Sequence, residues 1–219
     1  MLSHKQAKAF YDRFGRKQDW QSFYENVAIE ALIRNGEFDM ASAVLEFGCG
    51  TGSFAERLLD EHLPANARYV GVDISDTMVS LAKQRLARFG GRAEVYRSDG
   101  SPRLDFGEAT FDRFVSNYVL DLLNFEDIET ILQEAWRVLS PGGILELTSL
   151  TPGFTAASRT VTVIWKALHS IRPMLVGGCR PIHLLELVTG ERWQVRYSNR
   201  FSSFGVPSEV LVVGKVMIS

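Results

Sequence analysis

Cysteine is scarce in this chain of 219 residues, which contains only Cys49 and Cys179. Two cysteines cannot build the disulfide framework of a small secreted domain, so a reducing, cytoplasmic setting is the simplest expectation. Long hydrophobic runs are also missing, because no apolar stretch approaches the ~20 residues that cross a membrane. No continuous apolar run follows residues 1–6 either. We therefore expect neither a signal peptide nor stable membrane insertion.

An excess of charge of one sign is absent as well. The 24 Lys and Arg residues nearly balance the 26 Asp and Glu residues, leaving a net charge of −2. Such a chain has no general attraction for nucleic acid, so we expect no nucleic-acid partner. No group of Cys, His, Asp and Glu shows the spacing of metal ligands, which argues against a metal site. The composition is that of a globular protein, and the length predicts a single domain over residues 1–219.

Short apolar runs alternate with helical patterns from residue 43 onward. The runs predict strands over 43–47, 69–72, 93–97, 111–119 and 144–150. Apolar residues recur at helical spacing between them, over 54–63, 75–86 and 127–139. This order of elements is typical of βαβ units, in which helices cover both faces of a parallel sheet.

The end of the chain departs from this alternation. Two strand-like runs, over 193–204 and 209–218, follow one another with only residues 205–207 between them. A hairpin of this kind adds an antiparallel strand to a parallel sheet. The predicted fold is therefore an α/β, doubly wound sheet of about seven strands, mostly parallel, with an antiparallel strand in a C-terminal hairpin.

The beginning of the chain, over residues 2–34, shows a helical pattern that Gly15 is expected to divide into two helices. In the second helix, Phe23, Tyr24 and Val27 recur at the spacing of one helical face. That spacing predicts a contact with the core rather than with a ligand.

A glycine loop is the most informative segment of the sequence. Gly48, Gly50 and Gly52 directly follow the first predicted strand and precede a helix. Such a loop lets a ligand approach the backbone closely, near the N-terminus of the helix. A bare structural turn is the alternative for an isolated glycine string.

Acidic residues at the ends of the next two predicted strands favour a ligand site. Asp73 lies 21 residues after Gly52, where a carboxylate can accept hydrogen bonds from both hydroxyls of a ribose. Asp99 and Gly100 end the third strand, where a side chain can face the edge of an adenine. Open α/β sheets bind ligands at these strand ends, which predicts an adenosine ligand.

The residues of the glycine loop discriminate between adenosine ligands. A dinucleotide places its pyrophosphate on such a loop, yet Glu46 lies two residues before Gly48, and residues 48–54 include no Lys or Arg. The third glycine of the dinucleotide fingerprint would fall at Ser53. S-adenosylmethionine, which carries an ammonium and a sulfonium beside its adenosine, suits this acidic loop better.

Five segments resemble, in order and spacing, the motifs of class I S-adenosylmethionine-dependent methyltransferases. They are residues 46–52, 71–75, 98–100, 111–117 and 138–143. The resemblance extends over about residues 40–150, and the terminal hairpin matches the sixth and seventh strands of the Rossmann-like fold of that family. These motifs are specific for the family but not for a substrate.

The resemblance implies roles for the residues around the glycine loop. Glu46 would bind the ammonium of the methionyl group, and the backbone of Gly48, Cys49 and Gly50 would pass under the cofactor. Cys49 is expected to serve as a small residue there rather than as a nucleophile. Asn117, at the end of the fourth strand, would lie close to the methionyl arm.

The resemblance also implies a binding site for the adenosine. Asp73 would hold the ribose, while Ile74 and Met78 would flank the adenine. Asp99 and Gly100 would bind the amino edge of the base.

Residues 1–40 are expected to form a helical lid. Residues 11–14, with Tyr11 first, resemble the aromatic N-terminal lid that covers the cofactor in quinone and phospholipid methyltransferases. An ordinary amphipathic helix packed on the sheet is the alternative. His4 carries no signal for a function.

The stretch over residues 151–190 is longer than a usual crossover and rich in apolar residues. One helical face carries Val161, Ile164, Trp165 and Leu168. No acidic residue occurs over 151–185, where the basic residues are Arg159, Lys166, Arg172 and Arg180. In the family that the chain resembles, an insertion at this position lies over the methyl group, so this one would roof the acceptor site. Apolar walls with a basic rim suggest a small lipophilic acceptor; a seal for the sheet edge or a dimer interface is the alternative.

The predicted function is therefore methyl transfer from S-adenosylmethionine to a small, lipophilic molecule. No residue stands out as a general base, because His169 and His183 each carry only a weak signal; Cys179 could line the acceptor site. A catalytically silent S-adenosylmethionine-binding protein and, less favoured, a nicotinamide-dependent oxidoreductase remain as alternatives. The sequence leaves the oligomeric state open.

Overall fold

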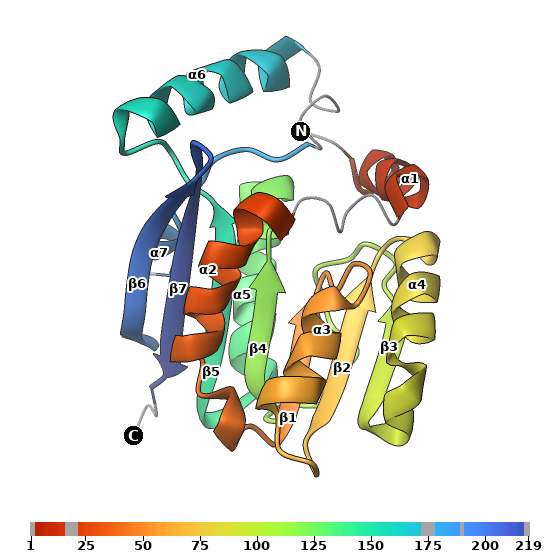
Figure 1. Ribbon diagram of the computed structural model, residues 1–219. Helices are drawn as coiled ribbons and strands as arrows, with labels where there is room; N and C mark the ends of the chain where they lie inside the picture. Colours follow the sequence, from red (N-terminus) through yellow and green to blue (C-terminus); the bar gives the residue numbers. More distant parts are fainter. Residues whose placement is uncertain (1–2, 16–21, 172–177, 189–190, 217–219) are drawn as a thin grey trace.

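A seven-stranded sheet forms the centre of the molecule. The computed structural model describes residues 3–15, 22–171, 178–188 and 191–216. The strand order is β3-β2-β1-β4-β5-β7-β6, and β7 alone runs in the direction opposite to the other strands (Figure 1). The strands are β1 Ala43–Phe47, β2 Arg68–Asp73, β3 Ala93–Arg97, β4 Phe111–Asn117, β5 Leu139–Leu150, β6 Trp193–Ser203 and β7 Val206–Lys215. This arrangement is the Rossmann-like, mostly parallel sheet that the sequence predicts.

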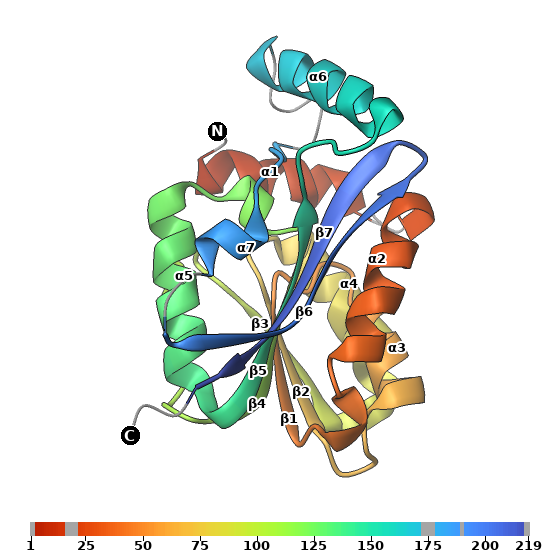
Figure 2. The ribbon, with the colours of Figure 1, turned by 90° about the vertical axis from the view of Figure 1, so that its left-hand side faces the viewer.

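Helices cover both faces of the sheet. One layer holds α2, α3 and α4, and the opposite layer holds α5 and α7 (Figure 2). Two further helices, α1 and α6, lie beyond the end of the sheet toward which β1, β2 and β4 point (Figure 1). The helices are α1 His4–Phe14, α2 Ser22–Asn35, α3 Ser53–Arg57, α4 Asp76–Leu86, α5 Phe125–Val138, α6 Ala156–Ile171 and α7 Leu184–Leu187.

Burial explains why these strands form the core. All five residues of β1 are buried, because helices pack against both faces of a central parallel strand. Alternate residues of each strand enter separate clusters: Val44 packs with the α2–α4 layer, and Leu45 packs with α5. None of the helices in the described ranges combines the length and the apolar composition needed to cross a membrane.

The C-terminal hairpin turns earlier than predicted. Ser203 pairs with Val206, so the turn consists of Phe204 and Gly205, both of which have positive φ (50° and 81°). Two consecutive residues with positive φ form the tight hairpin turn whose twist matches that of the flanking strands. The strand predicted over 209–218 therefore lies three residues too late at each end, and the turn occupies residues 204–205 instead of 205–207.

The strand β5 also begins earlier than the predicted residue 144. It starts at Leu139, immediately after α5, and its pairing with β4 jumps from Phe111–Leu139 to Arg113–Ile144. Residues 140–143 bulge out between these two pairs, with Gly142 at φ +75°. The turn residues are thus present as predicted, but they interrupt a strand instead of preceding it.

The N-terminal region forms two helices, and Gly15 ends the first of them as predicted. Residues 16–21 lie outside the described residues, as do the side chains of Phe23 and Tyr24. Val27 is 46% exposed, so the prediction that it enters the core was wrong. Its neighbour Ala28 is buried instead, because the buried face of α2 is formed by Ala28, Ala31 and Leu32.

Candidate functional site

A cavity lies where β1, β2 and β4 end, beside α1. The space between its walls is about 820 Å³, open solvent included. The strand order reverses between β1 and β4, and open α/β sheets bind ligands at this reversal. Seven of the eleven predicted site residues line the cavity: Tyr11, Gly48, Asp73, Ile74, Met78, Gly100 and Asn117.

The glycine loop turns tightly at the end of β1. The backbone N–H groups of Gly48 and Cys49 both donate to the carbonyl oxygen of Val72, at 2.8 and 3.0 Å. Gly48 has φ +81°, and a Cβ at this position would lie 2.2 Å from Cγ2 of Val119. Only glycine therefore fits, and its bare backbone forms part of the cavity wall.

Asp73, at the end of β2, is fixed by the backbone of two loops. Its Oδ2 accepts a hydrogen bond from the N–H of Gly50 at 2.9 Å, and its Oδ1 accepts one from the N–H of Ser75 at 2.8 Å. Burial raises the pKa of Asp73, and these two donors oppose that shift. Each carboxylate oxygen has a second lone pair, so the cavity side of Asp73 can accept further hydrogen bonds.

Glu46 and Asn117 place polar atoms in a buried position next to the glycine loop. Glu46 is 2% exposed, and burial raises its pKa to about 7, although the Tyr69 hydroxyl donates a hydrogen bond to it. The side-chain oxygen and nitrogen of Asn117 are buried and have no partner in full hydrogen-bonding geometry among the described residues, although the amide lies close enough to the Glu46 carboxylate to oppose the rise in its pKa. Unpaired buried polar atoms that line a cavity indicate a ligand that would satisfy them.

The opposite wall of the cavity is apolar. Ile74 and Met78 line it from the start of α4, and Gly100 closes it from the loop after β3. Gly100 has φ +95°, and a Cβ there would lie 2.8 Å from Cδ1 of Ile74. The backbone of this loop therefore packs closely against Ile74, and together they form an apolar part of the cavity wall.

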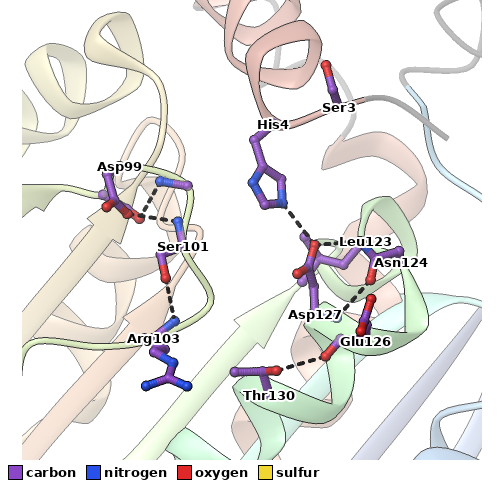
Figure 3. Close-up of polar contacts among 12 residues, drawn as sticks. Ser3, His4, Asp99, Ser101, Arg103, Leu123, Asn124, Glu126, Asp127 and Thr130 are labelled. Atoms are coloured by element: carbon purple, nitrogen blue, oxygen red, sulfur yellow. Dashed lines mark hydrogen bonds and ion pairs between the residues drawn. The ribbon is translucent and has the colours of Figure 1, made fainter.

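Four of the predicted residues do not line the cavity: Glu46, Cys49, Gly50 and Asp99. Glu46 lies below the surface against Tyr69, and Gly50 contributes through its bond to Asp73. Cys49 is buried, and burial raises the pKa of its thiol, in keeping with a packing role. Asp99 is exposed, and its carboxylate accepts a hydrogen bond from the N–H of Ser101 at 2.8 Å (Figure 3).

The helix α1 spans the mouth of the cavity. His4, Ala7 and Tyr11 line the cavity from one face of this helix. At its first turn, Nε2 of His4 lies 2.9 Å from Oδ2 of Asp127 at the start of α5 (Figure 3).

The other half of α1 is held by the start of α4. Oδ1 of Asp12 accepts hydrogen bonds from the hydroxyl of Ser75 at 2.6 Å and from the N–H of Thr77 at 3.3 Å. Lys8 pairs with Asp76 at 2.7 Å. The helix thus bridges the two sides of the cavity through contacts that no spacing in the sequence reveals.

Several residues that line the cavity were missed at the sequence level. They are His4, Ala7, Phe47, Val72, Ser98, Tyr118, Val119, Leu122 and Leu123. Tyr118 has φ +55°, and its hydroxyl donates to Oγ of Ser208 at 2.9 Å. The apolar run after Asn117 was a usable signal, because it follows the end of a strand. His4 offered none, since its partner Asp127 is 123 residues away.

The stretch over 151–190 contributes no side chain to the cavity among its described residues. The indole N–H of Trp165 donates to the carbonyl oxygen of Cys179 at 3.0 Å, which ties α6 to the segment after it. Burial raises the pKa of the Cys179 thiol, so the thiolate is disfavoured. His183 precedes α7, and the side chain of His169 lies outside the described residues. None of these residues is placed as a general base in the cavity.

Comparison with protein families and curated proteins points to one kind of domain. Residues 44–143 match the family model described as a methyltransferase domain. The chain is 28% identical over 173 residues to a malonyl-[acyl-carrier protein] O-methyltransferase of Erwinia pyrifoliae, covering 78% of this chain and 60% of that protein. It is 32% identical over 143 residues to a demethylmenaquinone methyltransferase of Leptospira interrogans, covering 61% and 53%. The chain thus spans only part of the length of these relatives.

A solved structure gives the same fold. The N-methyltransferase NodS of Bradyrhizobium japonicum, in complex with S-adenosyl-L-homocysteine, superposes with a TM-score of 0.67 at 20% sequence identity. The match covers 87% of each chain. At this identity, the likeness concerns the fold alone.

Proposed function

We propose that this chain, whose residues 44–143 match the family model described as a methyltransferase domain, is a class I S-adenosylmethionine-dependent methyltransferase that transfers a methyl group to a small, lipophilic acceptor. One observation carries the proposal: the unpaired amide of Asn117 and the fixed carboxylate of Asp73 face one cavity at the strand reversal. These groups match the two polar ends of S-adenosylmethionine, the amino acid and the ribose.

The residues present fit this cofactor. Asn117 would receive the methionyl group, with the Glu46 carboxylate behind it to attract the ammonium. Asp73 would accept the ribose hydroxyls, and the adenine would lie against the apolar wall formed by Ile74, Met78 and Gly100. When bound, S-adenosylmethionine supplies a sulfonium whose methyl group is electrophilic.

The contribution of the protein is to position the reactants and exclude water. In-line displacement at a methyl group needs the two reacting atoms to be held close together in a dry site. Tyr11 and the face of α1 on which it lies would cover the bound cofactor. An acceptor that is already a good nucleophile, such as a thiolate, a phenolate or a carbanion, needs little more than this.

The nature of the acceptor rests on the cavity wall formed by Val119, Leu122 and Leu123. These apolar side chains follow Asn117, so they would lie beside the reacting methyl group. They suit a lipophilic molecule, and a relative named as a demethylmenaquinone methyltransferase agrees with that choice. We also propose that the stretch over 151–190 helps to cover the acceptor.

The test combines cofactor titration with a turnover assay. The full chain is titrated calorimetrically with S-adenosylhomocysteine, NAD and NADP, and S-adenosylhomocysteine production is then measured with a quinol, a phospholipid, a small thiol and a charged peptide. Micromolar affinity for S-adenosylhomocysteine and turnover of a lipophilic acceptor are expected. Tighter binding of a dinucleotide would contradict the cofactor assignment. Cofactor binding without turnover of any acceptor, a metabolite extract included, would support a silent binding protein instead.

A further inference from the structure

The helix α6 has the reverse of the usual amphipathic arrangement. Its polar residues Ser158 and Thr162 are buried, at 0% and 6% exposure, whereas Val163, Ile164 and Ile171 are 67%, 54% and 78% exposed. A helix on the surface of a globular protein normally turns its apolar side toward the core. Packing against the residues that the structure describes therefore does not explain the exposed apolar residues of α6.

Hydrogen bonds hold α6 in this orientation. The hydroxyl of Ser158 accepts from the N–H groups of Phe154 and Thr155, at 3.0 and 2.9 Å. The hydroxyl of Thr162 accepts from the N–H of Gly153 at 3.0 Å. These bonds join the polar side of α6 to the loop that precedes the helix, and the bond from Trp165 to Cys179 joins it to the segment that follows, while Val163, Ile164 and Ile171 stay exposed.

The outward side forms a surface that we name the α6 stripe: Val163, Ile164, Leu168 and Ile171, with Phe204 of the hairpin turn beside it. Phe204 is 80% exposed. The turn touches the helix, since a Cβ on Gly205 would lie 3.0 Å from Cγ2 of Val161. Figures 1 and 2 both show α6 as the outermost element, at the end of the molecule where the cavity lies.

We propose that the α6 stripe docks on the surface of an anionic lipid bilayer, with the helix lying in the plane of the interface. An exposed apolar helix face bordered by basic residues binds the boundary between headgroups and acyl chains without crossing the membrane. Arg159 is exposed on α6, and the sequence holds no acidic residue from 151 to 185. The charge of this segment therefore complements anionic headgroups.

Size and shape favour lipid over a second copy of the chain. Sixteen residues make a helix ~24 Å long and ~10 Å wide, whose outward face covers at most about 240 Å². A stable dimer buries about 800 Å² on each partner. The stripe is also a single convex helix, and a lipid surface requires no matching groove.

Docking in this way would turn the cavity end of the molecule toward the bilayer, from which a lipophilic acceptor could enter. The proposal agrees with the proposed methyl transfer but does not depend on it, because lipid binding is measured without turnover.

The experiment is vesicle co-sedimentation of the full chain. Vesicles of phosphatidylcholine alone are compared with vesicles that also contain phosphatidylglycerol. We expect binding to the anionic vesicles that weakens at high salt, and a fall of at least ~tenfold in the partition coefficient for the Val163→Glu/Ile171→Glu variant. Val27→Glu, which changes a half-exposed valine of α2, serves as the matched control and should bind like the parent.

Circular dichroism and S-adenosylhomocysteine titration establish that each variant is folded. Failure of the parent to bind anionic vesicles overturns the proposal, as does unchanged binding by the double variant. The parent and the double variant are also compared by light scattering. If the parent is a dimer, the double variant is a monomer and neither binds vesicles, the stripe is assigned to a second copy of the chain instead. In every case the cofactor titration tests the proposed methyl transfer separately.

Discussion

The hydroxyl of Tyr69 on β2 donates a hydrogen bond to Oε2 of Glu46 on β1, with 2.5 Å between the two oxygen atoms, and both side chains are buried. This bond holds a carboxyl group directly behind the glycine loop. Burial raises the pKa of Glu46 to about 7, so the group changes its charge near neutral pH. The stability of the protein and its affinity for a cationic ligand should both depend on that charge.

The first prediction concerns stability and pH. The folded chain retains a proton on Glu46 up to about pH 7, whereas the unfolded chain loses it near pH 4.5. The free energy of unfolding should therefore fall as pH rises from 4.5 to 7, by up to about 3 kcal/mol from this group. Glu46→Gln should lack this component in denaturant titrations across that range. An identical pH dependence in parent and variant would contradict the assignment.

The same residue predicts how ligand binding varies with pH. An ammonium favours the ionised form of Glu46, so affinity for S-adenosylhomocysteine should rise as pH increases through about 7. Glu46→Gln should bind more weakly above this pH and show little pH dependence. Glu129→Gln, an equivalent change at an exposed carboxylate of α5, is the control in calorimetric titrations. If the affinity of Glu46→Gln varied with pH as that of the parent does, Glu46 would not face the ammonium.

The second prediction concerns Asp73. Removal of its carboxylate leaves two ribose hydroxyls without their acceptor, which should weaken cofactor binding about tenfold to a hundredfold in Asp73→Ala. The matched control is Asp39→Ala, which changes an exposed aspartate away from the cavity. Calorimetry measures both affinities, and a change within about twofold for Asp73→Ala would exclude a ribose contact.

The third prediction concerns the attachment of α1. Asp12→Ala removes the acceptor that joins this helix to Ser75 and Thr77, so α1 should open more often and the cofactor should dissociate about threefold to tenfold faster. Lys5→Ala, at an exposed position of the same helix, is the control. Stopped-flow fluorescence gives the dissociation rates. Equal rates in the two variants would mean that α1 does not cover the cofactor.

The fourth prediction concerns Trp165, which joins α6 to Cys179. If the stretch over 151–190 covers the acceptor, Trp165→Ala should raise the acceptor KM or abolish turnover, while cofactor affinity barely changes. Leu185→Ala, at a half-exposed leucine of α7, is the comparison. Unchanged acceptor kinetics together with a changed oligomeric state would assign this stretch to an interface.

Sequence alone determined the order of the strands along the chain and, for β1, β3 and β5, the residue at which each strand ends. Buried strands must be continuous and apolar, and the loop after the first strand must carry glycine where the backbone takes a positive φ, as at Gly48. Asp73 could be predicted because parallel strands bring their carboxyl ends to one edge, whereas Asn117 was identified through the resemblance to methyltransferase motifs. These features depend on local conformation and on periodicity, which a sequence displays directly.

Only the tertiary structure decided the contacts between segments that are distant in the chain. The bond from His4 to Asp127 and the position of Asp12 at the start of α4 depend on how α1 crosses the sheet, which no spacing encodes. The outward direction of Asp99 depends on a hydrogen bond to its own loop. The predicted helical face of α6 is split in the structure, because Ile164 and Leu168 are exposed whereas Trp165 donates a hydrogen bond to the backbone of Cys179. Periodicity identifies a face, but the hydrogen bonds that are satisfied in three dimensions decide where that face points.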